Sequence, residues 1–351
     1  QSDWTWVAGA FVLSLLMAHL SYHWVEVPTR QYLSQASLWR EIVAIAAFGV
    51  LIGLAAVTVK LKSFEGRVPE AVEIAAGEAK NLNHHVDECH QCVDTSCNYG
   101  HGNLGAIVIG DSHAASVVTS VNQANNSQSR IMLWSFNGCP TAKNAKFSPI
   151  TGKPSLACFN FNEWIFDQVR SSYNNVPLII VNRLGFAVFG PNEVFEPTRH
   201  NHPTIYFSEI HEFVNASFIN EFKKNYLDGM CILSKKNPVY LVRPIPEMGI
   251  DVPKTLSRNI MFGRGNEDIK ITLAEYHERQ KLIYQIQDEA AEKCGVKILD
   301  PLPYLCDDQY CYGSKNGRPL YYDDDHLSEY GNKFLVPMFE QVFKDHKIGV
   351  R

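Results

Sequence analysis

Residues 104–113 read Leu-Gly-Ala-Ile-Val-Ile-Gly-Asp-Ser-His, a short apolar run that ends in a turn. Short runs of β-branched residues bounded by turn residues are typical of strands, so the sequence predicts a strand over residues 106–109. Gly110 and Asp111 follow the run, and Ser112 stands where the chain would enter a helix. Open α/β sheets place reactive groups at the carboxyl ends of their strands. The sequence therefore predicts that Ser112 lies at the edge of such a sheet.

The rest of the chain repeats this alternation of short apolar runs and amphipathic segments. Further strands are expected over residues 131–134, 178–181, 239–242 and 296–299. Helices are expected, from apolar recurrence at three and four residues, over residues 160–172, 211–236, 271–294 and 327–347. Alternation of this kind indicates a mostly parallel sheet covered on both faces. We therefore expect an α/β fold, a three-layer, flavodoxin-like domain with a mostly parallel five-stranded sheet.

The first sixty residues differ in composition from the rest of the chain. Residues 4–22 and 42–59 contain no Asp, Glu, Lys or Arg, and each is about long enough to cross roughly 30 Å of hydrocarbon. Trp24 and Trp39 near their ends are typical of membrane interfaces, which favours two transmembrane helices over buried soluble ones. The chain opens on Gln1 rather than Met, and we expect it to be a piece of a longer protein.

Charge and cysteine content narrow the compartment and the partners. The formal net charge is −5, and the basic residues are scattered, so nucleic acid is not an expected partner. All nine cysteines follow the second apolar segment, as in proteins of oxidising compartments. The pairs expected are Cys139 with Cys158, Cys231 with Cys294, and Cys306 with Cys311. Residues 61–351 are therefore expected outside the cytoplasm.

A second group of cysteines allows two interpretations. Three of them lie near four histidines, at Cys89, Cys92, Cys97, His84, His85, His90 and His101. Three thiolates and one imidazole would satisfy a tetrahedral zinc site. An oxidising compartment favours a local disulfide instead, and no metal site is expected.

A candidate base and carboxylate for Ser112 lie near the C-terminal end, where residues 322–328 read Tyr-Asp-Asp-Asp-His-Leu-Ser. A serine hydroxyl needs a base to take its proton and a carboxylate to orient that base. Asp323 precedes His326 by three residues, a spacing that lets one tight turn carry both groups. Alone, Ser112 could be a helix cap and the acidic run a solvated loop. Their combination favours a triad of Ser112, His326 and Asp323.

These motifs resemble those of a known family. Gly110-Asp111-Ser112-His113 and Asp323-x-x-His326 are similar to the first and last blocks of the SGNH (GDSL-like) hydrolase superfamily. The His after the serine, Gly-Cys-Pro at 138–140, Pro-Glu at 246–247 and a Cys-x4-Cys before the last block resemble the SGNH domains fused to membrane acyltransferase family three domains. Residues 21–30 resemble the end of that membrane domain's last helix, and residues 42–59 an additional span.

The resemblance implies roles for individual residues. Ser112 would be the nucleophile, His326 the general base and Asp323 its orienting partner. The oxyanion donors would be the backbone N–H groups of Ser112 and Gly138 and the side chain of Asn182. The usual Gly-x-Asn-Asp block is absent, and Val-Asn-Arg-Leu-Gly at 181–185 stands in its place, so the role of Asn182 rests on position. Arg183 is expected to be a structural or a substrate-binding residue.

The resemblance also implies a division of the chain. Residues 1–60 would hold the end of the membrane acyltransferase domain and one additional transmembrane helix, residues 61–103 an extracytoplasmic linker, and residues 104–351 the SGNH catalytic domain. The protein would lie in a bacterial inner membrane, with its catalytic domain in the periplasm.

The implied activity is O-acetyltransfer. An acetyl group would pass through an acyl-serine to a sugar hydroxyl of lipopolysaccharide O-antigen or another surface glycan. No cofactor is expected in this chain; acetyl-CoA is the implied donor for the membrane domain. Two alternatives remain open, an exported carbohydrate esterase or deacetylase of the same fold and a non-catalytic, anchored glycan-binding module. The aromatic residues Phe186, Phe189, Tyr206 and Phe207 are interpreted either as a sugar platform or as core.

Overall fold

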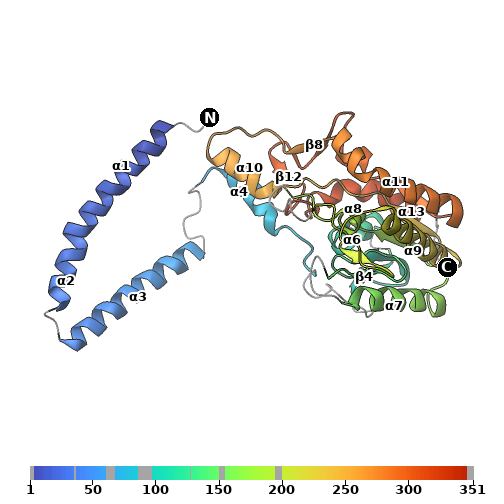
Figure 1. The fold of residues 1–351 in the computed structure, drawn as a ribbon, viewed down its shortest axis with the longest axis horizontal. Helices are drawn as coiled ribbons and strands as arrows, with labels where there is room; N and C mark the ends of the chain where they lie inside the picture. Colours follow the sequence, from blue (N-terminus) through green and yellow to red (C-terminus); the bar gives the residue numbers. More distant parts are fainter. Residues whose placement is uncertain are drawn as a thin grey trace. The chain divides into compact units, whose positions relative to one another are not determined.

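The structure is a computed structural model that describes residues 4–34, 37–60, 68–85, 97–126, 128–149, 155–193 and 200–345. The chain forms two compact units, residues Gln1–Arg67 and Val68–Arg351 (Figure 1). The second unit begins ahead of the expected catalytic domain and takes in part of the expected linker.

The first unit consists of long apolar helices. Helix α1 (Trp4–Ser21) continues through a π-helical turn, η1 (Tyr22–Glu26), into α2 (Val27–Ser34), and α3 spans Leu38–Lys60. Their apolar side chains are exposed, among them Phe11, Leu51 and Ile52. The described segments Val7–Ser34 and Leu38–Val59 are long and apolar enough to cross a bilayer, where the sequence predicted two membrane helices.

The second unit is built on a six-stranded sheet with the strand order β1-β3-β2-β5-β7-β9. Its strands are β1 (Asn98–Tyr99), β2 (Leu104–Gly110), β3 (Arg130–Ser135), β5 (Leu178–Val181), β7 (Val239–Val242) and β9 (Lys297–Leu299). The five predicted strands are confirmed and pair in parallel. The expected strand number needs one correction, because β1 adds an antiparallel edge strand. A strand of two residues has no side-chain period to recognise in sequence.

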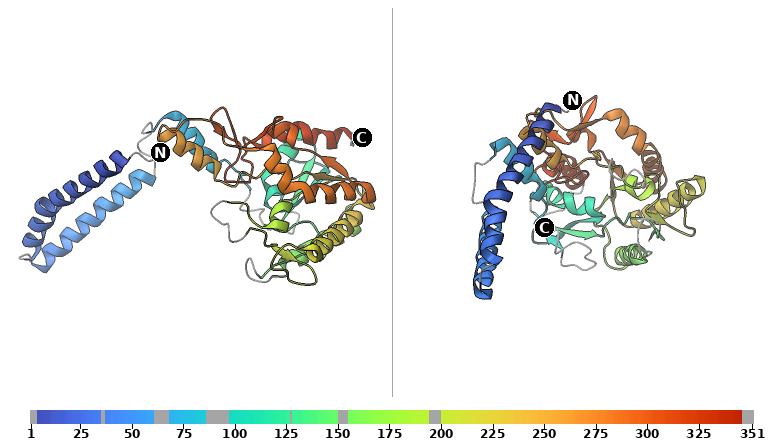
Figure 2. Two further views of the ribbon diagram at one scale, coloured as in Figure 1. Left: turned by 45° about the horizontal axis from the view of Figure 1, so that its top comes forward. Right: turned by 60° about the vertical axis from the view of Figure 1, so that its left-hand side comes forward.

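Helices cover both faces of this sheet (Figure 2). They are α6 (Ser112–Ala124), α7 (Ala157–Ser171), α9 (Ala216–Ser234), α11 (Leu273–Cys294) and α13 (Val336–Asp345). Successive strand residues point to opposite faces: Ala106 and Val108 share one core with α6 and α13. Ile107 and Ile109 share the other core with α7, α9 and α11. The predicted three-layer architecture is confirmed.

Smaller elements fill the connections. They are α4 (Glu70–Gly77), η2 (Glu78–Lys80), α8 (Leu184–Phe189), α10 (Val252–Met261), α12 (Leu302–Leu305) and η4 (Asn332–Leu335), with the two-stranded sheets β4 (Lys146–Phe147) with β6 (Ile205–Tyr206), β8 (Lys270–Thr272) with β10 (Tyr310–Tyr312), and β11 (Ser314–Lys315) with β12 (Arg318–Pro319). The last helix was predicted from residue 327, but the described chain is helical only from Asn332. Residues 320–328 form a closed loop instead, because Ser328 N–H donates to the Leu320 carbonyl.

The three predicted disulfides, Cys139–Cys158, Cys231–Cys294 and Cys306–Cys311, are present. Cys97 is buried, whereas Cys89, Cys92 and His90 lie outside the described residues. The choice between zinc and a local disulfide in that segment therefore stays a prediction.

Gly110 ends β2 for a steric reason. A Cβ at this position would lie 1.8 Å from the carbonyl oxygen of Val181 on the neighbouring strand β5, closer than any two such atoms can approach. Glycine therefore lets β2 and β5 end side by side, and the residues that follow each strand emerge next to one another.

Candidate active site

Asp111 joins the ends of two strands. It caps α6, whose first residue is Ser112, and its Oδ1 accepts the backbone N–H of His113 at 3.0 Å. Its Oδ2 accepts the backbone N–H of Arg183, beyond β5, at 2.7 Å. Burial raises the pKa of the Asp111 carboxyl. The serine is thus held at the N-terminus of a helix and fixed relative to the neighbouring strand.

The loop over residues 320–328 presents a carboxylate and an imidazole together. Tyr322 N–H donates to the His326 carbonyl at 3.0 Å and closes a tight turn. Asp323 Oδ1 accepts the backbone N–H groups of Asp325 and His326 at 3.0 and 2.8 Å. The Tyr322 ring stacks on the His326 ring, with centroids 5.2 Å apart. The spacing of three residues in the sequence therefore places both side chains on the inside of one turn.

The three residues predicted as a triad meet in space. His326 Nε2 lies 2.7 Å from Ser112 Oγ, and His326 Nδ1 lies 2.8 Å from Asp323 Oδ2. An ionised carboxylate can only accept a hydrogen bond, so Nδ1 carries a hydrogen, and once the imidazole is neutral Nε2 accepts from the serine hydroxyl. This is the geometry that nucleophilic catalysis requires of a serine, its base and the group that orients the base.

The expected oxyanion donors follow three neighbouring strands. Ser112, Gly138 and Asn182 come after the carboxyl ends of β2, β3 and β5, which lie adjacent in the sheet. Gly138 has φ of +63°, a left-handed conformation that favours glycine. Asn182 Oδ1 accepts the backbone N–H of Thr141 at 3.2 Å, which fixes the amide. Its Nδ2 is buried and has no partner among the described residues, so its two N–H groups remain as donors for a ligand.

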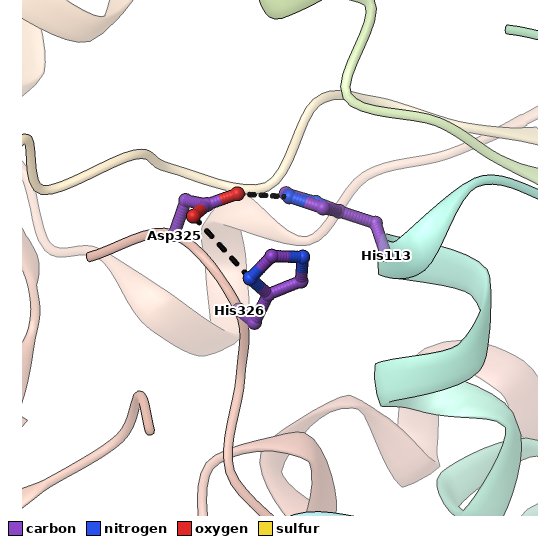
Figure 3. A group of neighbouring side chains, drawn as sticks. All are labelled: His113, Asp325 and His326. Carbon is purple, nitrogen blue, oxygen red and sulfur yellow. Dashed lines mark hydrogen bonds and ion pairs between the residues drawn. The ribbon is translucent and has the colours of Figure 1, made fainter. Parts of the chain in front are cut away.

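A second set of side chains surrounds the base (Figure 3). Asp325 Oδ2 lies 2.8 Å from His113 Nε2 and 3.2 Å from an Arg183 guanidinium nitrogen. Asp325 Oδ1 lies 3.3 Å from His326 Nδ1. No catalytic role was predicted from the sequence for His113 or Asp325. His113 entered only as part of the motif that carries the family resemblance, and the one signal for Asp325 was that it stands directly beside His326.

Burial and neighbouring charges shift the pKa values of His326, Asp325 and Asp324. Burial alone would lower the pKa of His326, but the negative charges of Asp325 and Asp323 and the hydrogen bonds to them raise that pKa well above 6.5. Burial alone would raise the pKa of Asp325, but His326 and Arg183 hold it well below its usual range. Burial and the neighbouring carboxylates raise the pKa of Asp324 to about 8.

The sequence allowed a structural or a substrate-binding role for Arg183, and its contacts support the structural role. Its side chain is only 10% exposed and forms ion pairs with Glu193 and Glu247 as well as with Asp325. Its guanidinium lies over the Phe186 ring. Buried positive charge needs such partners, so Arg183 and the acidic residues form one electrostatic unit.

The cluster also has the composition of a metal site. Ligand atoms of His113, Asp325 and His326 lie within 4.8 Å of one another, as do those of Glu193, Asp324 and Asp325. Asp325 belongs to both groups, and the Arg183 guanidinium already supplies it with a fixed positive charge. The donor set therefore fits a hydrogen-bonded charge network better than a cation site.

The four aromatic residues considered for a sugar platform separate in the structure. Phe207 is buried in the core, and Phe186 lies under Arg183. Phe189 lines a cavity of about 570 Å³, together with Asn192, His200, Asn201, Glu275, Glu278 and Arg279. Of the four, Phe189 alone is among the described residues that line this cavity.

Several solved structures are similar to this chain. The periplasmic domain of a lipopolysaccharide acetyltransferase from Salmonella ser. Paratyphi A is 14% identical, with a TM-score of 0.49 over 79% of this chain and 97% of that one. The C-terminal catalytic domain of peptidoglycan O-acetyltransferase A from Streptococcus pneumoniae is 13% identical, with a TM-score of 0.33 over 70% and 95%. Est24, a carbohydrate acetylesterase from Sinorhizobium meliloti, is 12% identical, with a TM-score of 0.36 over 70% and 98%.

No curated protein matches the sequence significantly. The family described as "SGNH domain (fused to AT3 domains)" matches residues 83–341, a range that contains the strands of the sheet, Ser112 and the loop that carries His326. This chain belongs to the family of SGNH domains that are fused to AT3 domains.

Proposed function

We propose that this chain belongs to an O-acyltransferase that moves an acetyl group, through an ester on Ser112, to a sugar hydroxyl of lipopolysaccharide O-antigen or another surface glycan. The observation that carries the proposal is the continuous contact from Ser112 Oγ to His326 Nε2 at 2.7 Å and from His326 Nδ1 to Asp323 at 2.8 Å. Membership of a family fused to AT3 domains supports transfer as the outcome.

In the first half-reaction, Ser112 Oγ attacks the acyl carbonyl of the donor while His326 Nε2 takes the hydroxyl proton. The developing oxyanion would accept hydrogen bonds from the N–H groups of Ser112 and Gly138 and from the spare Nδ2 of Asn182. The leaving group then departs with the proton from Nε2, and the acyl group remains on the serine. The donor is expected to be supplied by the membrane domain, from acetyl-CoA.

In the second half-reaction, a sugar hydroxyl attacks the acyl-serine. His326 Nε2 takes the proton of that hydroxyl and returns it to Ser112 Oγ as the ester bond breaks. The two apolar helices support an anchored protein, and the proposed location is a bacterial inner membrane, with the catalytic unit in the periplasm.

The experiment that tests transfer replaces Ser112 with Ala in the complete protein expressed in its host. Glycan acetylation, measured by mass spectrometry of the purified glycan, should be abolished while the protein stays folded and inserted. Ser171→Ala, at the exposed end of α7, is the matched control and should acetylate as the wild type does. Unchanged acetylation in Ser112→Ala contradicts the proposal.

Hydrolysis by the same acyl-serine is the second candidate, because water can replace the sugar in the second step. The ratio of free acetate released to acetate retained on the glycan separates the two. A transferase retains most of the acetate, whereas a carbohydrate esterase releases it and strips acetyl groups already present. A protein whose Ser112 does not react with acylating probes would instead be a binding module.

A further inference from the structure

Two carboxylates face the same nitrogen of the base. Asp323 Oδ2 accepts the hydrogen bond from His326 Nδ1 at 2.8 Å, and Asp325 Oδ1 lies 3.3 Å from that nitrogen. Their surroundings differ, because the Asp323 side chain is 32% exposed and the Asp325 side chain only 4%. Water screens the charge of an exposed carboxylate far more than that of a buried one. The buried carboxylate is therefore the stronger source of field at the imidazole.

The charge of Asp325 is held in place from two other elements. His113, on α6, points its Nε2 at Asp325 Oδ2 (Figure 3). Arg183, after β5, places a guanidinium nitrogen 3.2 Å from the same oxygen. Because the carboxylate only accepts, His113 must donate from Nε2, and its Nδ1 is buried without a partner among the described residues. Both donors therefore favour the ionised form of Asp325.

We propose that Asp325, held by His113 and Arg183, is a second, buried carboxylate for the base: a positioning residue that stabilises the His326 imidazolium while Asp323 fixes the tautomer. This inference rests on the proposed role of His326 as base. When Nε2 takes the Ser112 proton, the new positive charge lies beside Asp325, which stays ionised and takes no proton itself. Because Asp325 supplies the stabilising charge, Asp323 needs only to fix the tautomer, and its side chain can be partly exposed.

Other charged or titratable groups also face Asp325 and belong in the account. Glu247 shares Arg183 with it, Asp324 is its chain neighbour, and the Tyr321 ring is buried nearby with its pKa raised by burial and by Asp325. Glu247 and Asp324 repel the Asp325 charge, whereas Arg183 and the two histidines attract it. Removal of the Asp325 charge is therefore expected to lower the pKa of His326.

The test is the pH dependence of Ser112 modification by phenylmethanesulfonyl fluoride, followed by intact mass on the complete 351-residue chain in detergent micelles. In the wild type the rate should rise with pH as His326 loses its proton. In Asp325→Asn the midpoint should move lower by about 1–3 pH units, and the plateau rate should fall roughly tenfold because the base is weaker. A folded Asp325→Asn chain with the wild-type midpoint overturns the proposal.

Two variants of His113 test the proposal if Asp325→Asn does not fold. His113→Leu removes a donor to Asp325, and His113→Gln offers an amide donor in its place. Slowed modification in His113→Leu that His113→Gln restores supports the proposal, and a wild-type rate in His113→Leu overturns it. The probe needs neither acyl donor nor glycan, so these outcomes do not depend on whether the protein is a transferase.

Discussion

Asn182 is the residue whose role depends most on what the structure adds. Its carbonyl is engaged by Thr141, and its buried Nδ2 is free among the described residues. Asn182→Ala is expected to lower turnover of p-nitrophenyl acetate by about 10²–10³-fold, the usual cost of losing one oxyanion donor. The pH midpoint should not move, because no charge near His326 changes. A loss smaller than about threefold would remove Asn182 from the oxyanion site.

Asp324 and His326 make stability depend on pH in one direction. The pKa of Asp324 is raised to about 8, so the folded chain holds an extra proton between about pH 4 and 8, and stability falls as pH rises through that window. The raised pKa of His326 gives stability that is complete below about 6.5 and is lost as pH rises through its folded value.

The unfolding midpoint in detergent should therefore be lower at pH 9 than at pH 6, by about 2–4 °C for each kcal/mol lost. Asp324→Asn should make that decrease smaller, because an amide does not titrate. A wild-type midpoint that rises over this interval would contradict the assignment.

Among the individual site residues, the sequence predicted the triad of Ser112, Asp323 and His326 but not the second carboxylate, Asp325. Ser112, Asp323 and His326 carry a chemical requirement that can be stated without coordinates. Three consecutive aspartates precede the histidine, and side chains in an irregular turn follow no period. Only the fold shows that Asp325 points inward to His113.

Among the elements, the disulfide Cys139–Cys158 joins the loop after β3 to α7, and Asn162 on that helix donates to the Pro140 carbonyl at 3.1 Å. Replacing both cysteines with Ser should cost about 3 kcal/mol of unfolding free energy for residues 19 apart. It should also lower Ser112 acylation by at least about tenfold, because the neighbouring Gly138 N–H would lose its fixed position.

The matched control lies at the opposite edge of the sheet. Cys231 is near the end of α9 and Cys294 ends α11, and these helices lead into the amino ends of β7 and β9. The pair spans 63 residues, so its removal should cost more stability, about 4 kcal/mol, yet leave acylation at the wild-type rate. Equal acylation losses in both double variants would mean that the chemistry responds only to general stability.

Longer helices and strands were predicted from the sequence more reliably than short ones. Five strands were found because each is a short apolar run bounded by turn residues, and the main helices were found because their apolar side chains recur at three and four residues. Strand β1 has two residues and is specified by its partner β3, which lies more than thirty positions away. The start of the last helix was placed too early because the backbone N–H groups of Ser328 and Glu329 donate to the carbonyls of Leu320 and Asn81, residues distant in the sequence, rather than within a helix.

For the whole molecule, the division at residues 67 and 68 predicts separable behaviour. A chain that begins at Val68 contains both cores, the triad and the three described disulfides. It should stay in the supernatant after ultracentrifugation without detergent, and phenylmethanesulfonyl fluoride should modify its Ser112 at the rate of the complete chain. It should not acetylate glycan in cells, because the proposed donor route is missing. Sedimentation with membranes would assign bilayer affinity to the catalytic unit itself.

The contact between Ser112 and His326 joins residues 214 positions apart. During synthesis the Ser112 hydroxyl is made 214 residues before the His326 imidazole, so a nascent chain that lacks His326 has no base to activate the serine towards an ester. Reactivity appears only once the latest-made strand has joined the sheet and the turn beyond it has closed. Acylation of Ser112 therefore requires a completed fold, and an incomplete chain that lacks His326 consumes no donor.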